Sequence, residues 1–175
     1  MENILEKTIV LGGGCFWCLE ALYQKVEGIT SITSGYAGGS VPSPTYENVC
    51  SGSTGHAEVV RLTYDSKKLT LETIIQLFFE IHDPTTMNAQ GNDIGTQYRS
   101  VIFYADAEEK SIIEKVRDEA QKNFHDKIVT QILPLPEFYP AESYHQNYYR
   151  NHPDQPYCVA VISPKLQKFL KNHPV

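Results

Sequence analysis

Residues 8–18 read Thr8-Ile9-Val10-Leu11-Gly12-Gly13-Gly14-Cys15-Phe16-Trp17-Cys18. The apolar run before the glycines predicts a buried strand over residues 6–13. The pattern after them predicts a helix over residues 16–26, which ends before Glu27-Gly28 with the glycine as its C-cap. The glycines allow a sharp turn between these two elements. Cys15 then lies at a helix N-terminus, where free backbone N–H groups and the helix dipole favour the thiolate. We therefore expect Cys15 to be a reactive cysteine rather than a structural one.

The next part of the chain alternates strands and helices around this unit. Strands are expected over residues 29–36, 56–64 and 98–105, and a helix over residues 70–82 with Thr70 as its N-cap. The six elements follow the strand-helix-strand-strand-helix-strand order of the ferredoxin-like split βαβ unit. The pattern thus predicts an α+β fold, a two-layer ferredoxin-like sandwich with its helices on one face of the sheet.

The remainder of the chain is expected to wrap this unit. It adds a helix capped by Asp106 and Glu109, a strand over residues 128–133, and a short basic helix over residues 165–171. We find no repeat, linker or low-complexity segment. We therefore expect a single catalytic domain over residues 1–175, with a core of about 6–133 and an irregular C-terminal segment of about 134–175.

Composition and charge exclude several classes of protein. The chain has 175 residues, of which 41% are hydrophobic and 21% charged, as in an ordinary soluble domain. The net charge of −6 argues against a nucleic-acid or anionic-membrane partner, because both require a basic surface. No apolar run reaches the roughly 18 residues of a membrane span, and the N-terminal residues lack the apolar core of a signal peptide. We therefore expect no membrane association and a cytoplasmic location.

The C-x-x-C spacing of Cys15 and Cys18 leaves three chemistries open: peroxide or sulfoxide chemistry, thioredoxin-like disulfide exchange, and a zinc half-site. Zinc would need two further ligands, which Cys50 and His56 would have to supply, but no second C-x-x-C is present, so we expect no metal. Otherwise Cys50 is expected to be buried and inert. Cys158 lies in a tail rich in Pro and Tyr, whose mobility would suit it to attack an oxidised cysteine elsewhere.

Other candidate site residues each have a packing alternative. Phe16 and Trp17 follow the thiol and would either wall an apolar pocket or enter the core. Glu58 heads an apolar strand face, where burial would raise its pKa and make it a proton donor, whereas solvation would leave an ordinary charge. Three residues beside the glycine-rich loops would hold a polar oxygen or serve packing: Tyr46, Asp93 and Tyr98. His145 is a further candidate because its neighbours are aromatic.

Several long motifs together resemble, in order, those of the A-type peptide methionine sulfoxide reductases. They cover about residues 8–150 and comprise Gly14-Cys15-Phe16-Trp17, Ser34-Gly35-Tyr36-Ala37-Gly38-Gly39, Pro44-Thr45-Tyr46-Glu47, Gly55-His56-Ala57-Glu58, Gly91-Asn92-Asp93, Gly95-Thr96-Gln97-Tyr98-Arg99-Ser100 and Tyr144-His145-Gln146. Ordered motifs of this length are far more specific than a lone C-x-x-C. The resemblance implies a ferredoxin-like α/β core, in agreement with the order of elements.

By this resemblance, Cys15 is the nucleophile and Glu58 is the proton donor. The other implied site residues are Phe16 and Trp17 for the substrate's S-methyl group, Tyr46, Tyr98 and Asp93 for its oxygen, and Tyr148 and Tyr157 at the pocket rim. The implied reaction reduces methionine S-sulfoxide, in proteins or free, through a Cys15 sulfenic acid. A second cysteine then forms a disulfide, which an external dithiol such as thioredoxin reduces. No bound cofactor is implied. We expect a monomer whose partners are oxidised proteins or free methionine sulfoxide, and thioredoxin.

Two departures from the family pattern bear on the second cysteine. Cys18 stands where many members have glycine, and Cys158 is alone in the tail, where some members carry two cysteines. Cys18 lies one helical turn from Cys15, whereas Cys158 has a family-like Tyr-Cys context. We favour Cys158 as the resolving cysteine and keep Cys18 as the alternative or as a relay. The competing functions are a thioredoxin-like dithiol oxidoreductase and a small zinc-binding module.

Overall fold

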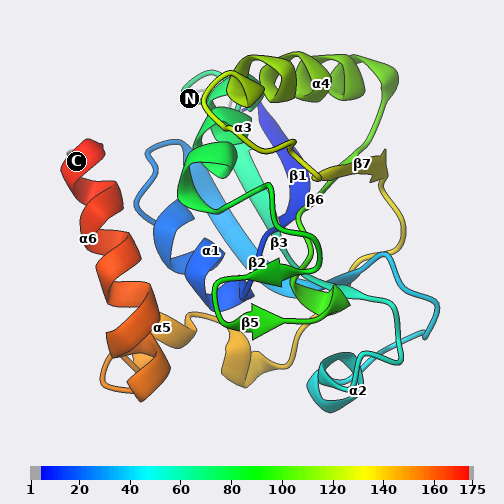
Figure 1. The fold of residues 1–175 in the computed structure, drawn as a ribbon, viewed down its shortest axis with the longest axis vertical. Coiled ribbons are helices and arrows are strands. Elements are labelled where there is room, and N and C mark those ends of the chain that lie inside the picture. The colour runs from blue at the N-terminus through cyan, green and yellow to red at the C-terminus, as the bar shows by residue number, and fades with distance from the viewer. Residues whose placement is uncertain (1–4, 174–175) are drawn as a thin grey trace.

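The computed structural model describes residues 5–173 and has a six-stranded sheet at its centre (Figure 1). The strand order is β7-β6-β1-β3-β2-β8. The bounds are β1 (Glu6–Gly12), β2 (Ile29–Ala37), β3 (Ala57–Asp65), β6 (Val101–Tyr104), β7 (Gln131–Pro134) and β8 (Tyr139–Pro140). Neighbouring strands are antiparallel except β6 and β7, which are parallel. The sheet is therefore mixed, and β1 lies between β3 and β6.

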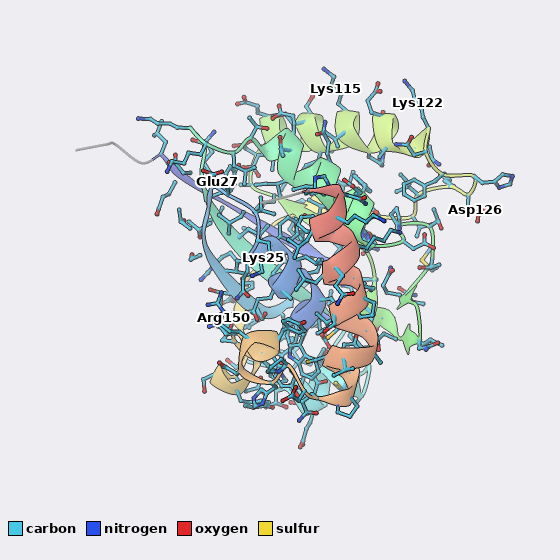
Figure 2. All side chains as sticks on the ribbon, turned by 90° about the vertical axis from the view of Figure 1, so that its left-hand side faces the viewer. Lys25, Glu27, Lys115, Lys122, Asp126 and Arg150 are labelled. Atoms are coloured by element: carbon cyan, nitrogen blue, oxygen red, sulfur yellow. The ribbon has the colours of Figure 1, made fainter. Side chains whose placement is uncertain are left out.

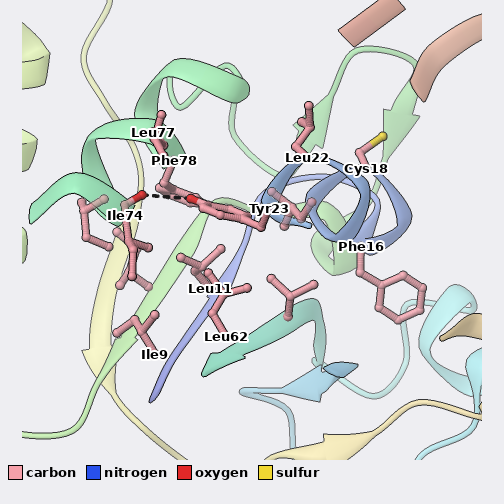
Figure 3. Close-up of a cluster of buried hydrophobic side chains, with 14 of the residues drawn as sticks. Ile9, Leu11, Phe16, Cys18, Leu22, Tyr23, Leu62, Ile74, Leu77 and Phe78 are labelled. Atoms are coloured by element: carbon pink, nitrogen blue, oxygen red, sulfur yellow. Dashed lines mark hydrogen bonds between the residues drawn. The ribbon is translucent and has the colours of Figure 1, made fainter. Parts of the chain in front are cut away.

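Helices α1 (Phe16–Tyr23) and α3 (Leu71–Ile81) pack on one face of this sheet (Figure 3). Leu11 of β1 belongs to the same buried cluster as Tyr23 and Phe78 of the two helices. The Tyr23 hydroxyl donates to the Ile74 carbonyl oxygen at 2.9 Å and joins α1 to α3. These contacts anchor the strand-turn-helix unit that carries Cys15.

Alternation along β3 separates the two faces of the sheet. Val59 belongs to a second cluster on the far face, which Phe138 packs against. Val60 and Leu62 belong to the helix-covered cluster. Because successive side chains of a strand point to opposite faces, Glu58 shares the face of Val60 and Leu62, as the sequence predicts.

Helices α3 and α4 (Ala107–Gln121) begin at the predicted caps. The Thr70 side chain accepts a hydrogen bond from the first turn of α3. At α4, the Glu109 N–H donates to Asp106 Oδ1, and the Ala105 N–H donates in turn to Glu109 Oε1. Such reciprocal capping satisfies backbone donors that a helix end leaves free. Figure 1 shows α4 lying against α3.

Element boundaries in the first two-thirds of the chain differ from the prediction in three places. Helix α1 ends at Tyr23 rather than at residue 26, and Gly28 lies on the turn into β2 with φ of +100°. Strand β6 begins at Val101 because residues 96–98 form a turn of 3₁₀-helix. Three short elements were not expected: α2 (Tyr46–Cys50), β4 (Ala89–Gln90) and β5 (Asp93–Ile94).

Much of the segment from residue 135 to 157 is irregular, and the helix expected over residues 165–171 is present, but the helical structure that includes it begins earlier than expected, at Cys158. The segment after residue 134 contains α5 (Tyr148–Asn151), a π-helical segment (Cys158–Ile162) and α6 (Ser163–Asn172). Ile162, Leu166 and Phe169 are buried at helical spacing and form the apolar stripe of this helical region. Figure 2 shows α6 beside α1, with Arg150 labelled near α5. No helix within residues 5–173 combines the length and apolarity of a bilayer span.

Candidate active site

The triple-glycine turn holds Cys15 at the N-cap of α1. Gly14 has φ of +86°, and its N–H donates to the Tyr98 carbonyl oxygen at 3.1 Å. A Cβ atom on Gly13 would lie 2.8 Å from the His82 ring, so no larger residue fits there. Cys15 itself is only 8% exposed. The turn therefore holds the thiol in a buried position.

The expectation that the helix N-terminus makes Cys15 a thiolate is wrong for the resting protein. Burial raises the pKa of the Cys15 thiol well above its usual value, and the charges of Glu58 and Cys18 raise it further. A hydrogen bond from the Trp17 backbone N–H lowers this pKa, but by less. Burial thus outweighs the helix end, and the resting thiol is protonated at neutral pH.

Glu58 is a buried, neutral carboxylic acid close to this thiol. Its Oε1 accepts the Phe16 N–H at 3.1 Å, and its Oε2 is buried without a partner. Burial raises the pKa of Glu58 to about 8, a rise that the Phe16 hydrogen bond opposes and the Asp93 charge reinforces. The prediction of a raised pKa is confirmed, and a solvated strand-end charge is excluded. A carboxyl in this state can donate a proton near neutrality.

The two aromatic residues after Cys15 have different environments. Phe16 is fully buried, as the packing alternative predicts. Trp17 is half-buried, and its indole stacks on Tyr148 with ring centroids 3.7 Å apart and planes 6° from parallel. The Trp17 Nε1–H donates to His145 Nδ1 at 3.1 Å. Tyr46 stacks over both Phe16 and Trp17. Trp17 therefore presents a fixed aromatic surface beside the thiol.

Polar groups surround Glu58. Burial, followed by the Glu58 charge, raises the pKa of both Tyr46 and Tyr98, so their hydroxyls remain neutral donors. The Asp93 carboxylate raises the pKa of Glu58 and Cys15, which places it near both groups. The structure thus gathers the five residues predicted for the reacting centre from five parts of the fold: the N-cap of α1 (Cys15), α2 (Tyr46), β3 (Glu58), β5 (Asp93) and the 3₁₀ turn before β6 (Tyr98). Among residues 5–173, no group of three or more His, Cys, Asp or Glu side chains is arranged to hold a metal ion.

A family model for peptide methionine sulfoxide reductases matches residues 7–174. The chain belongs to the peptide methionine sulfoxide reductase family. The reductase named MsrA of Saccharolobus solfataricus is 54% identical over 168 residues, which cover 96% of this chain and 95% of that protein. The enzyme therefore reduces methionine sulfoxide.

Solved structures agree with this assignment. The reduced form of Mxr1 from Saccharomyces cerevisiae has a TM-score of 0.83 and 41% identity, and the match covers 87% of this reductase and 89% of that chain. Mxr1 has also been solved in complex with Trx2, with a TM-score of 0.60, 30% identity, and coverage of 82% and 84%.

The other cysteines of the reductase are free thiols in contrasting environments. Cys18 is buried, and its Sγ lies 3.9 Å from the Tyr157 hydroxyl. Burial raises the pKa of Cys18 to about 11, although the Lys165 charge opposes the rise. Cys158 is fully buried in the π-helical segment, so the expectation of a mobile tail thiol is wrong for this state. Cys50 is exposed, contrary to the expectation of burial.

The predicted rim residues lie beside Trp17. Tyr148 stacks on the indole face, and Tyr157 meets the indole edge-on with centroids 5.8 Å apart. The Tyr157 hydroxyl also donates to Asp93 Oδ2 at 2.5 Å. This hydrogen bond links the segment that precedes Cys158 to β5, the short strand that carries Asp93.

Sequence reasoning missed Glu142. Its carboxylate accepts hydrogen bonds from the Tyr36 hydroxyl, the Tyr46 N–H and the Tyr144 hydroxyl. The sequence offered one signal that could have identified Glu142: it is an acidic residue that closely precedes the Tyr144-His145-Gln146 motif.

Proposed function

We propose that this reductase converts methionine S-sulfoxide, in proteins or free, to methionine with Cys15 as the nucleophile and Glu58 as the proton donor. The observation that carries this proposal is the buried Glu58 carboxyl, with a pKa of about 8 and an unpartnered oxygen, close to the Cys15 thiol. A sulfoxide oxygen is a poor leaving group until it is protonated. A neutral carboxyl beside a nucleophilic sulfur supplies that proton.

The proton balance follows from the resting charges. Glu58 gives its proton to the sulfoxide oxygen as the Cys15 sulfur attacks the sulfoxide sulfur. The attack forms a transient bond between the Cys15 sulfur and the substrate sulfur. The hydroxyl oxygen then passes to the Cys15 sulfur as this bond and the sulfur–oxygen bond of the substrate break, so that methionine leaves and Cys15 becomes a sulfenic acid. The proton of the Cys15 thiol restores Glu58 to its neutral form. The Tyr46 and Tyr98 hydroxyls, with Asp93 beside them, hold the oxygen during this transfer.

Aromatic side chains would hold the S-methyl group. The Trp17 face is fixed by the Tyr148 stack and the His145 hydrogen bond. Phe16 supports this surface from within the core. We assign Tyr148 and Tyr157 to the rim of the substrate site because both rings contact the indole.

Two further cysteines would resolve the sulfenic acid in sequence. Cys15, Cys18 and Cys158 belong to one buried cluster, and the Cys18 Sγ lies 3.9 Å from the hydroxyl of Tyr157, the residue before Cys158, which supports an intermediate position for Cys18. Cys18 condenses with the sulfenic acid to form a disulfide and water. Cys158 then attacks the Cys18 sulfur, which frees the Cys15 thiol and leaves a Cys18–Cys158 disulfide.

Thioredoxin or another external dithiol would reduce the final disulfide, as the Mxr1–Trx2 complex suggests for a relative. We propose a cytoplasmic monomer with no bound cofactor and a single catalytic domain over residues 1–175. The antiparallel order β6-β1-β3-β2 supports a ferredoxin-like core. A thioredoxin-like function would need a parallel sheet around β1, whereas β1 is antiparallel to both neighbours.

The proposal is tested by mixing the enzyme with equimolar S- or R-sulfoxide of methionine without external reductant. We expect about one equivalent of methionine from the S epimer within one turnover, and none from the R epimer or from Cys15→Ser. Methionine formation by Cys15→Ser would refute the role of Cys15. Turnover of the R epimer at the same rate would refute the stereochemical assignment.

A further inference from the structure

We propose that Glu142 is a positioning residue for sulfoxide reduction, which holds Tyr46 and Tyr36 in place beside Glu58. The inference rests on the proposed role of Tyr46 as a hydroxyl that holds the substrate oxygen. Glu142 lies in the turn that follows β8, far along the chain from both tyrosines. Its side chain joins three segments that build the oxygen side of the site.

The Glu142 carboxylate uses both oxygens as acceptors. Oε1 accepts the Tyr36 hydroxyl at 3.0 Å. Oε2 accepts the Tyr46 backbone N–H and the Tyr144 hydroxyl, each at 3.1 Å. Tyr36 lies on β2 and Tyr46 is the first residue of α2, so one carboxylate ties a strand of the sheet to a separate short helix.

Helix α2 needs such an external tie. It has five residues, whereas isolated helices shorter than about 12–15 residues are marginal in water. Its Thr45–Asn48 capping box is local and does not connect it to the sheet. Val49 is buried and anchors one side of the helix in the core. The bond from the Tyr46 N–H to Glu142 fixes the other side, and with it the start of the Tyr46 side chain.

The turn that carries Glu142 is itself fixed to β2. The Gln146 side chain accepts the Ser34 N–H and donates to the Ser34 carbonyl oxygen, each at 2.9 Å. The Ala141 N–H also donates to the Ser34 carbonyl oxygen, at 2.8 Å. Tyr36, two residues further along β2, is the cross-strand partner of Glu58 on β3. Glu142 is therefore held at a set distance from the proton donor.

Near neutral pH the Glu142 carboxyl is ionised, whereas the Glu58 carboxyl is mostly neutral. Burial acts to raise the pKa of Glu142, but hydrogen bonds from its own backbone N–H and from Tyr46 and Tyr36 outweigh burial and lower this pKa. Glu142 is thus ionised and accepts only, which suits a group surrounded by donors. Its removal would leave the Tyr46 N–H without an acceptor and free α2 to shift.

A double-mutant cycle tests this role through the single-turnover rate. Glu142→Ala should slow the parent by about 10- to 100-fold, the scale on which a shift of about 1 Å acts on a reacting group. In a Tyr46→Phe background, Glu142→Ala should slow the single-turnover rate by less than about 3-fold, because the hydroxyl that Glu142 positions is absent. Thermal unfolding is recorded for all four proteins.

Glu137→Ala is the matched control. Glu137 is exposed in the preceding loop, where its Oε2 accepts the Tyr139 hydroxyl at 3.2 Å and no hydrogen bond joins it to Tyr46. It should leave the rate within about 2-fold of the parent, the range of an exposed substitution. If Glu142→Ala does not fold, Glu142→Gln replaces it in the cycle, because the amide keeps the shape and loses one acceptor.

If Glu142→Ala slows the single-turnover rate by the same factor in the parent and in Tyr46→Phe, the inference is overturned, because a general structural role of Glu142 predicts this result. If Tyr46→Phe alone reacts at the parent rate, the oxygen-holding role of Tyr46 fails, and this inference fails with it. A slow Tyr46→Phe with equal costs would leave the proposed function intact and refute only the positioning role of Glu142.

Discussion

Replacement of Glu58 by glutamine separates proton donation from shape. At pH 7 a carboxyl with a pKa of about 8 is protonated in about 90% of molecules, so nearly all resting enzyme holds the required proton. Glutamine keeps the Phe16 hydrogen bond through its amide oxygen but cannot supply a proton. Glu58→Gln should therefore slow single turnover by about 10²- to 10⁴-fold, the usual range for general acid catalysis.

The same pKa predicts the pH dependence of the parent. If Glu58 alone controls the pH dependence, the single-turnover rate should be constant below about pH 8. Above pH 8 it should fall about tenfold per pH unit, because the Glu58 carboxyl loses its proton. Rapid-quench measurement of methionine formation between pH 6 and 10 records both effects. A Glu58→Gln rate within a few-fold of the parent would show that the proton comes from another group.

Burial of Glu58 also costs stability, with a defined sign. The folded pKa of about 8 exceeds the usual 4.5, so the folded protein keeps a proton that the unfolded chain releases between these values. The free energy of unfolding therefore falls as pH rises through this window, by about 3 kcal/mol at pH 7 from this group. Glu58→Gln stays neutral and should be more stable than the parent at pH 7, with a smaller gain at pH 5. Urea unfolding at the two pH values measures the difference, and a Glu58→Gln variant less stable at pH 7 would contradict it.

Four further variants have expected outcomes that follow from the same contacts. Cys18→Ser should leave the first turnover intact but stop disulfide transfer, whereas Cys158→Ser should accumulate a Cys15–Cys18 disulfide and block thioredoxin recycling. Peptide mass spectrometry identifies the disulfide that each variant forms. A Cys15–Cys158 disulfide in Cys18→Ser would make Cys158 the direct resolving thiol. Tyr148→Ala should alter the fluorescence of Trp17, the only tryptophan, and raise KM more than it lowers kcat; unchanged emission and KM would remove Tyr148 from the substrate site. Thr70→Ala should cost about 1 kcal/mol of unfolding free energy through loss of the α3 cap, without a change in turnover.

Local signals in the sequence predicted much of the fold and the reacting centre. The alternation of strand 56–64 correctly placed Glu58 on the helix-covered face, and Thr70 and Asp106 marked helix starts, because each signal depends on neighbours along the chain. Cys15 was placed correctly at a helix N-terminus, but its pKa was not. That pKa depends on burial by distant segments, which a local motif does not report.

The C-terminal region was predicted less well because its structure depends on tertiary contacts. The helix over residues 165–171 was expected, but the Pro and Tyr content before it suggested a mobile tail, whereas Cys158 is buried in the π-helical segment that precedes α6. Glu142 was missed for a similar reason, because its partners Tyr36 and Tyr46 lie 106 and 96 residues away. No local pattern encodes contacts at such separations.

Direct trapping of the oxidised nucleophile tests the central claim. A Cys18→Ser, Cys158→Ser double variant retains Cys15 and the exposed Cys50 as its thiols. After one equivalent of methionine S-sulfoxide, a reagent specific for sulfenic acids should label the Cys15 peptide in step with methionine release and leave Cys50 unlabelled. Methionine release without label on Cys15, or with the label on Cys50, would contradict the account.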